Sequence, residues 1–348
     1  MSEPITQSAA PAAVPAKRRI DHADTMRGVC ILLVNYFHSN VSFFMLKYVS
    51  SICVHPFLFM AGYFFSGKAP LGVTFKKKLR TLIVPYYVLG VAYYLVWFVF
   101  SYGSGADVIA PLKAVLYSPI GGFPIEPSLY FLPVMFFSGM ILAVIVKFIK
   151  NEYIRFALVM GITLLGSIWN DRFSMRLPMS LDCAFAVLLY FYLGFHGRKI
   201  LAFTDTLVEK LRYKWLRLLV FFALSAINLW MIEANYIPNI LNSSWRFVPL
   251  THFNTCLLML LWVYFFRFTE TLGFLKLVNK ALKYIGENSI LFMCFSHIGL
   301  KVARVLVSYV PISNMFILKT LYCVISLLLV VPVVEIFNRT KLHHIFGK

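Results

Sequence analysis

Charged residues are scarce in this sequence, and acidic residues are the scarcest of them. Of its 348 residues 14% are charged, 60% are hydrophobic, and Asp and Glu together number 14. Soluble domains are typically about 25% charged and about 45–50% apolar. One large core does not explain the excess, because apolar runs of membrane-spanning length recur along the whole chain. The composition therefore predicts a polytopic membrane protein.

Other absences narrow the function. No basic run carries interleaved aromatic residues, so the net charge of +19 does not indicate nucleic-acid binding. No small-residue cleavage site closes the first apolar run, so a retained helix is expected there instead of a signal peptide. No internal repeat stands out, which disfavours a transporter built of duplicated halves. No CxxC pair occurs, so we expect neither a disulfide framework nor a metal site from Cys30, Cys53, Cys183, Cys256, Cys294 and Cys323.

The hydropathy pattern predicts an all-α membrane bundle of about ten transmembrane helices. We expect residues 1–16 to be a disordered tail, 17–340 to form the membrane domain, and 341–348 to be a short cytoplasmic tail. The expected spans lie near residues 26–46, 48–66, 81–101, 128–149, 154–169, 180–196, 216–233, 250–268, 284–302 and 313–337.

The distribution of Lys and Arg predicts the orientation. With the N-terminus inside, 25 of them fall on the cytoplasmic side and eight on the outer side, which places both termini in the cytoplasm. The longest outer loop, 102–127, is rich in Gly and Pro, and we expect substrate contacts there. The longest inner loop, 197–215, is basic, and an interfacial helix on anionic lipid is the favoured interpretation.

The first predicted helix has a polar face. Arg27 and His38 are eleven residues apart, which leaves a remainder of roughly 20° after three turns and a separation of about 16 Å. Asp24, Asn35 and Ser42 fall on the same stripe. Each residue alone has a structural explanation, Arg27 as a helix-end marker and His38 as a satisfied histidine. Together they favour a site, because a cation at the inner mouth can hold an anionic donor and a deeper histidine can act as general base.

This helix resembles the opening of the acyltransferase 3 family of bacterial membrane O-acyltransferases. That family has an Asp-x-x-Arg-Gly sequence and an Arg-x10-His spacing, and Asp24, Arg27, Gly28 and His38 match it position for position. The likeness continues in the family's order with an apolar second helix, a basic run ending in Leu-x-x-Pro, an aromatic motif, a Leu-Gly helix end and an Asn-Ser motif closed by a histidine. These motifs fall at residues 55–64, 77–85, 130–136, 192–195 and 285–297.

The sequence departs from the family pattern at three of these positions. Lys77 replaces the first arginine of the basic run, Ala61 replaces a serine, and His55 replaces a methionine. Lysine offers a point charge where arginine would hold a phosphate with two parallel hydrogen bonds.

The resemblance implies an acyltransferase 3 domain over residues 17–340 in the bacterial cytoplasmic membrane. Its donor would be a cytoplasmic acyl-CoA, usually acetyl-CoA, and its acceptor a hydroxyl of an envelope or exported sugar, with no permanently bound cofactor and no metal. We expect Arg27, Lys77 and Arg80 to bind the donor phosphates, and Asp24 to hold Arg27 through an i,i+3 pair.

Candidate catalytic and acceptor-binding residues complete this expectation. His38 would take the proton of the attacking hydroxyl, and Asn35 would orient the imidazole or stabilise the oxyanion. A covalent acyl-histidine is the variant mechanism. Candidate substrate contacts are His297, Glu287, His252 and Asp182.

Three other classes of protein remain as alternatives. A lipid-linked saccharide transporter or flippase also needs charge inside the membrane. A polysaccharide polymerase would be expected to carry arginine-rich outer loops, whereas the outer arginines here are scattered. A non-catalytic scaffold leaves the polar face of the first helix unexplained.

Overall fold

A computed structural model of the chain describes residues 21–39, 48–51, 53–101, 103–117, 125–173, 175–235 and 247–346. Every regular element within these ranges is helical, which confirms the all-α prediction. Ser42, which was expected on the polar stripe of the first helix, lies outside the described residues.

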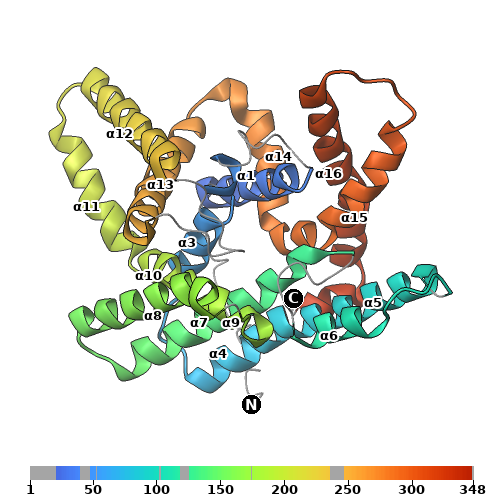
Figure 1. Ribbon diagram of the computed structural model, residues 1–348. Helices are drawn as coiled ribbons and strands as arrows, with labels where there is room; N and C mark the ends of the chain where they lie inside the picture. Colours follow the sequence, from blue (N-terminus) through green and yellow to red (C-terminus); the bar gives the residue numbers. More distant parts are fainter. Residues whose placement is uncertain are drawn as a thin grey trace, which may run out of the picture.

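Helix α1 (Asp21–Phe37) lies in the middle of the bundle (Figure 1). It packs against five other helices, which come from both halves of the chain. These are α3 (His55–Tyr63), α13 (Val248–Thr269), α14 (Lys276–Glu287), α15 (Ser289–Val307) and α16 (Met315–Arg339). The polar side chains of α1 therefore meet residues that are far away in sequence.

The other helices surround this centre. Helix α7 packs on α4, α9 and α10, α8 packs on α9 and α10, and α12 packs on α13. Their bounds are α4 (Leu71–Lys78), η1 (Leu79–Ile83), α5 (Val84–Ser101), α6 (Ile109–Tyr117), η2 (Pro127–Tyr130), α7 (Phe131–Phe148), α8 (Glu152–Phe173), η3 (Pro178–Ser180), α9 (Leu181–Ala186), α10 (Leu188–Phe195), α11 (Gly197–Lys210), α12 (Lys214–Asn235), η4 (Gly273–Leu275) and η5 (Lys341–Phe346).

Within the described residues, seven helices are long and apolar enough to cross a membrane, or eight if the bent pair α9–α10 is one span. These eight coincide with eight of the ten expected spans. The remaining two, near 26–46 and 48–66, fall partly on residues outside the described ranges. The membrane-helix architecture is thus supported at seven to eight spans, and the orientation of the termini stays a prediction.

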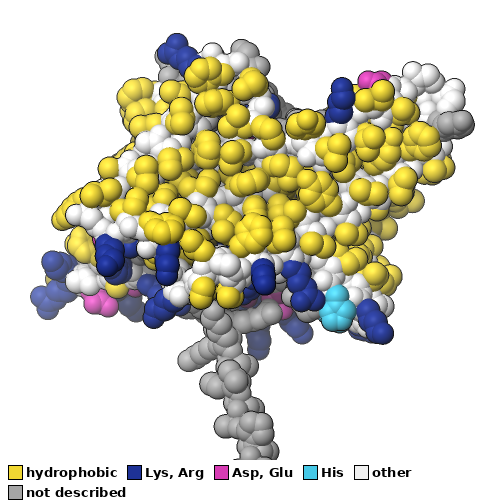
Figure 2. Space-filling model, turned by 90° about the horizontal axis from the view of Figure 1, so that it is seen from below, with side chains coloured by type: hydrophobic (Ala, Val, Ile, Leu, Met, Phe, Trp, Pro, Cys, Tyr) yellow, Lys and Arg dark blue, Asp and Glu magenta, His cyan; other side chains and the backbone are white. Residues whose placement is uncertain are grey.

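The surface of the bundle fits a bilayer. Figure 2 shows a broad hydrophobic face with Lys and Arg side chains gathered along its rims. Large apolar side chains are exposed on the long helices, for example Val99 (71% exposed), Phe100 (85%) and Trp230 (66%). Such side chains are stable next to lipid tails and costly in water.

The pair α9–α10 bends by 58° at Val187. Just before it, Met179 and Ser180 take positive φ values of 57° and 52°, a left-handed conformation that non-glycine residues rarely adopt. Neither residue type gives a sequence signal for this geometry. The expected span near 180–196 is thus bent, with the geometry of a broken span or of a re-entrant loop.

Glycines allow α1 and α14 to touch through their main chains. A Cβ atom on Gly28 would lie 2.0 Å from the carbonyl oxygen of Leu282, and one on Gly286 would lie 1.8 Å from that of Asp24. Small residues permit this close approach of helices in membranes. The position of Arg27 is therefore fixed by a backbone contact next to it.

A second crossing of the same kind joins α3 and α10. A Cβ on Gly62 would lie 1.9 Å from the carbonyl oxygen of Phe191, and one on Gly194 would lie 2.0 Å from that of Phe59. The two crossings hold α1 and α3 against different neighbours, and the candidate site lies between them.

Candidate active site

Two histidines from distant parts of the chain lie next to each other. His38 follows directly on α1, and His297 is in the middle of α15. Their ring centroids are 4.0 Å apart with the planes tilted by 57°. The sequence analysis proposed His38 as a base and His297 only as a substrate contact, and the structure brings the two rings together. The contact is between the rings, and Nε2 of His297 has no hydrogen-bond partner among the described residues.

Helix α15 also holds the main chain at His38. The Nη2 group of Arg304 donates a hydrogen bond of 2.8 Å to the carbonyl oxygen of His38. Arg304 is seven residues after His297, about two helical turns, so both lie on the same side of α15. The ring of His38 and its backbone are thus positioned by one helix.

Glu126 and Ser128 fix the other side of His297, and the sequence analysis missed both. Glu126 is fully buried, and its Oε2 accepts the backbone N–H of His297 at 3.0 Å. Ser128 donates to the carbonyl oxygen of Met293 at 3.0 Å and also contacts Oε1 of Glu126. In a regular α-helix the N–H of His297 would bond to the carbonyl oxygen of Met293, four residues earlier. Here Glu126 accepts from that N–H and Ser128 donates to that carbonyl oxygen.

Burial favours the protonated form of Glu126, which lies just before the span beginning at Pro127. Desolvation raises the pKa of this carboxyl group well above its ordinary value, against the opposing effect of its hydrogen bonds from Ser128 and His297. A protonated Glu126 can donate to the hydroxyl of Ser128, which then donates its own proton to Met293. The available sequence signal was an acidic residue directly ahead of the aromatic motif at 130–136.

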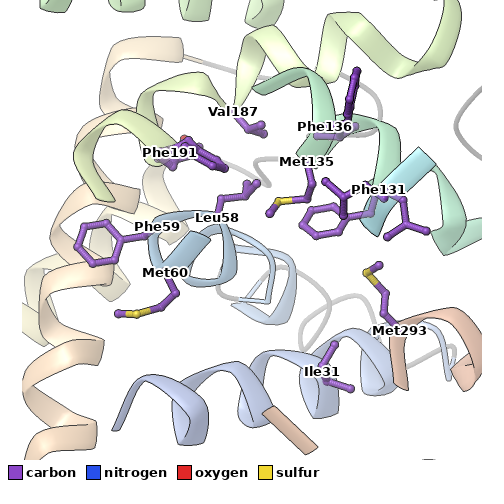
Figure 3. Packing of buried hydrophobic residues seen from close by; sticks show 14 of the residues in the cluster. Ile31, Leu58, Phe59, Met60, Phe131, Met135, Phe136, Val187, Phe191 and Met293 are labelled. Atoms are coloured by element: carbon purple, nitrogen blue, oxygen red, sulfur yellow. The ribbon is translucent and has the colours of Figure 1, made fainter. Parts of the chain in front are cut away.

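A cavity opens beside His38. Including its open mouth it measures about 860 Å³. Figure 3 shows that Ile31, Phe131, Val187 and Met293 extend toward a common space from different elements. The lining residues are Cys30, Ile31, Val34, Phe37, His38, Ser50, Cys53, Val54, Phe57, Ser128, Tyr130, Phe131, Val134, Cys183, Val187 and Met293. We call this the His38 cavity.

A second cavity, of about 820 Å³ with its mouth, lies at Arg27. The guanidinium group pairs with Asp24 at 3.1 Å, as the i,i+3 spacing predicted, and lies 4.8 Å from the ring centroid of Phe64. The lining residues are Arg27, Phe57, Ala61, Met135, Gly286, Glu287, Asn288, Ser289, Ile290, Leu291, Phe337, Asn338, His343 and Phe346. We call this the Arg27 cavity.

The C-terminal turn η5 forms one wall of the Arg27 cavity, although its residues were expected to be a tail. Phe346 is buried, and its ring centroid lies 5.6 Å from that of Phe337. His343 lines the same space. Glu287, an expected substrate contact, lines this cavity and is not among the residues that line the His38 cavity.

Phe57 lines both cavities. Its ring makes an edge contact with Phe131, with centroids 5.6 Å apart. Arg27 and His38 therefore lie at two different cavities, and these cavities adjoin at Phe57.

Asn35 contacts α16. It is fully buried, and its Nδ2 donates to the carbonyl oxygen of Cys323 at 3.2 Å, while its Oδ1 lies 3.5 Å from the hydroxyl of Ser326. The amide thus lies one turn before His38 and is engaged with the neighbouring helix.

In the basic run on α4 and η1, the side chain that points into the bundle is that of Lys78. The family pattern marks Lys77 and Arg80 instead. Lys77 and Arg80 are exposed and are not among the residues that line either cavity. Lys78 packs against Gly139, and its ammonium lies 5.3 Å from the ring centroid of Phe191.

His252 and Asp182 lie in separate buried clusters. Ser167 donates its proton to Thr163 at 2.8 Å, so it accepts Nε2–H of His252 at 3.0 Å, and Nδ1 of that ring accepts from Tyr190 at 2.7 Å. This pattern corresponds to a neutral imidazole.

Asp182 pairs with Arg176 at 2.8 Å, and its Oδ1 has no hydrogen-bond partner among the described residues. The next residue, Cys183, lines the His38 cavity.

A family model described as an acyltransferase domain matches residues 20–335, which is most of the chain. No curated protein and no solved structure is significantly similar to it.

Proposed function

The chain belongs to the acyltransferase 3 family, and from this premise we propose that it transfers an acyl group from cytoplasmic acyl-CoA to a hydroxyl of a cell-envelope or exported sugar. Acetyl-CoA is the donor that the resemblance implies. The observation that carries the proposal is the pair His38–His297, of which His38 lines one chamber, while Arg27 lines the adjoining one.

In the proposed reaction the sugar oxygen attacks the carbonyl carbon of the thioester. His38 takes the proton of the hydroxyl as the C–O bond forms, and the C–S bond then breaks as the thiolate of CoA leaves and takes up that proton from His38. His297, with its ring centroid 4.0 Å from that of His38, would hold the His38 imidazole in place through this ring contact. In the variant mechanism the acyl group is first attached to a histidine and then passed to the sugar.

The donor phosphates are assigned to the Arg27 cavity. CoA carries a diphosphate and a ribose phosphate, which favour arginine. Arg27 is half-buried and held by Asp24, so its guanidinium is already oriented. Lys77 and Arg80 remain proposed contacts for the part of the donor outside this cavity, where their exposed side chains can reach a solvated phosphate.

The acceptor is assigned to the opposite end of the stripe, in keeping with the predicted orientation. Asp182, with Arg176, and His252 remain proposed acceptor contacts. For Asp182 the supporting observation is its buried Oδ1, which has no hydrogen-bond partner among the described residues.

Labelled transfer tests the proposal. Purified full-length protein in lipid nanodiscs is given acetyl-CoA labelled in the acetyl group together with envelope saccharides, and the saccharide fraction is counted. Label in an alkali-labile ester, dependent on the protein, is the expected result. If no acyl-CoA donates to any hydroxyl acceptor, the proposal is wrong and the saccharide transporter becomes the favoured alternative.

A further inference from the structure

The His38 cavity is apolar except at a few points. Twelve of its sixteen lining residues are apolar, and the others are His38, Ser50, Ser128 and Tyr130. The hydroxyl of Ser128 is already bonded to the 293 carbonyl and to Glu126. None of the described residues that line it is Asp, Glu, Lys or Arg.

This lining does not suit a sugar. Each sugar hydroxyl taken out of water needs a hydrogen-bond partner, and without one the transfer is costly. Sites that select sugars or other polar ligands place several polar groups around them. Among the described residues the His38 cavity offers very few, which favours an alkyl group as its occupant.

The position of the cavity identifies which alkyl group. The proposed function places the thioester carbonyl at His38 and the CoA phosphates at Arg27. The cavities meet at Phe57, so the thiol arm approaches from the Arg27 side. The part of the donor that continues past the carbonyl, away from sulfur, is the acyl chain.

We propose that the His38 cavity is an acyl-chain pocket, and that the preferred donors carry a saturated chain longer than acetyl. This inference rests on the proposed function. An acetyl group has one methyl to bury, whereas the interior of the cavity, without its open mouth, measures about 80 Å³ and leaves room for a longer chain.

Three buried side chains are suitable for testing the pocket wall. Ile31 is 3% exposed, Val134 is 2% exposed, and Val187, at the break between α9 and α10, is 1% exposed. Figure 3 shows Ile31 and Val187 extending into the space from opposite sides. A larger side chain at 134 or 187 would shorten the space available to a chain.

The first experiment measures kcat/KM for transfer from acetyl-, butyryl-, hexanoyl-, octanoyl- and palmitoyl-CoA by the full-length protein in nanodiscs. Burying one methylene group is worth about 0.8 kcal/mol, so we expect roughly a fourfold rise per added methylene until the pocket is full. A flat or falling series from acetyl upward overturns the pocket and leaves the proposed function standing.

The second experiment changes the wall. Val134→Phe and Val187→Phe should each lower the hexanoyl-to-acetyl ratio of kcat/KM at least about tenfold, since two or more methylene groups lose their space. Phe131→Leu enlarges the pocket and should move the preferred acyl-chain length to a longer chain. This variant provides the test if Val134→Phe and Val187→Phe do not fold. Val96→Phe, the same change at a 49% exposed position of α5, is the matched control and should leave the ratio unchanged. Unchanged ratios in all three pocket variants contradict the proposal.

Binding without turnover separates the two hypotheses. The dissociation constants of acetyl-CoA and hexanoyl-CoA are measured on the same nanodisc samples, with CoA alone as the reference. Tighter binding of hexanoyl-CoA, lost in Val187→Phe, supports the pocket even if no acceptor is found. Equal binding of the two donors overturns it, as does a bilayer lipid that co-purifies in the cavity and is not displaced by hexanoyl-CoA.

Discussion

The two chambers along α1 differ in the groups that line them. The Arg27 cavity has a guanidinium, a carboxyl group, two amides and an imidazole, from Arg27, Glu287, Asn288, Asn338 and His343. The His38 cavity has one imidazole in a largely apolar wall. Under the proposed function, α1 contributes a binding group for the charged donor at one end and a proton acceptor at the other. If the proposed function holds, changes in the first chamber should alter donor affinity, and changes in the second should alter turnover.

The largest expected effect is that of His38→Ala. Removing a general base typically costs about 10²–10⁴-fold in rate, so kcat should fall by that factor while the donor dissociation constant changes less than about threefold. Initial rates and donor binding on the same sample measure both. His344→Ala, at an exposed histidine of η5, is the control. Full activity of His38→Ala would show that His38 is not the general base.

Arg27→Gln should have the next largest effect, and this effect should be on the KM of the donor. Hydrogen bonds to charged groups contribute about 1.5–3 kcal/mol, so the KM of the donor should rise roughly tenfold to a hundredfold with little change in kcat. Lys76→Gln removes the same charge from an exposed position of α4 and should have little effect. A loss of kcat at unchanged KM would contradict the assignment of donor binding to the Arg27 cavity and of catalysis to the His38 cavity.

Gly28→Ala tests the comparison of the two cavities by changing the packing of α1 on α14. A Cβ there would lie 2.0 Å from the carbonyl oxygen of Leu282, so α1 must move away from α14. Overpacking of this kind typically costs about 1–3 kcal/mol. Because Gly28 is next to Arg27, donor KM should change more than kcat, and thermal unfolding should occur at lower temperature. Gly161→Ala on α8 meets open space and should not destabilise the protein.

The smallest expected effect is that of Glu126→Gln. Since the pKa of Glu126 is raised by burial, glutamine mimics its protonated form and should keep most of the activity. Glu126→Ala, which leaves the N–H of His297 without its acceptor, should lower kcat roughly tenfold. Rescue by glutamine but not by alanine would identify a positioning role for this side chain.

The pH dependence of stability gives an independent check on Glu126. The folded state holds this proton to higher pH than the unfolded chain does. The wild-type protein therefore loses stability as pH rises above the ordinary glutamate pKa, toward the raised value. Glutamine removes this loss, so the melting temperature of Glu126→Gln relative to wild type should rise as the pH increases above the ordinary glutamate pKa. A difference that does not change with pH would contradict the raised pKa.

Sequence analysis predicted the elements of the site that lie on one helix. The spacing of Arg27 and His38 and the pair Asp24–Arg27 follow from helical periodicity, which is a local property. The contact between His38 and His297 joins positions 259 residues apart, and periodicity gives no information on it. The same holds for Glu126, whose importance lies in the backbone group that it reaches on α15.

Two other features were beyond sequence analysis for different reasons. The bend at Val187 lies within an apolar run that contains no Pro or Gly at that point, so hydropathy predicted one continuous span. In the basic run, charge alone does not tell which lysine faces the bundle. The packing of α4 on α7 turns Lys78 toward Gly139 and leaves Lys77 and Arg80 exposed.

The shared position of Phe57 has a consequence for the electrical insulation of the membrane. If the stripe from Arg27 to His38 does cross the bilayer, an open passage along it would conduct protons and small ions and discharge the membrane potential. Phe57, in contact with Phe131, places two aromatic rings where the chambers meet. A bulky apolar constriction is impermeable to hydrated ions because they cannot shed their water there. Conductance of bilayers that contain Phe57→Ala, compared with wild type, measures this seal directly.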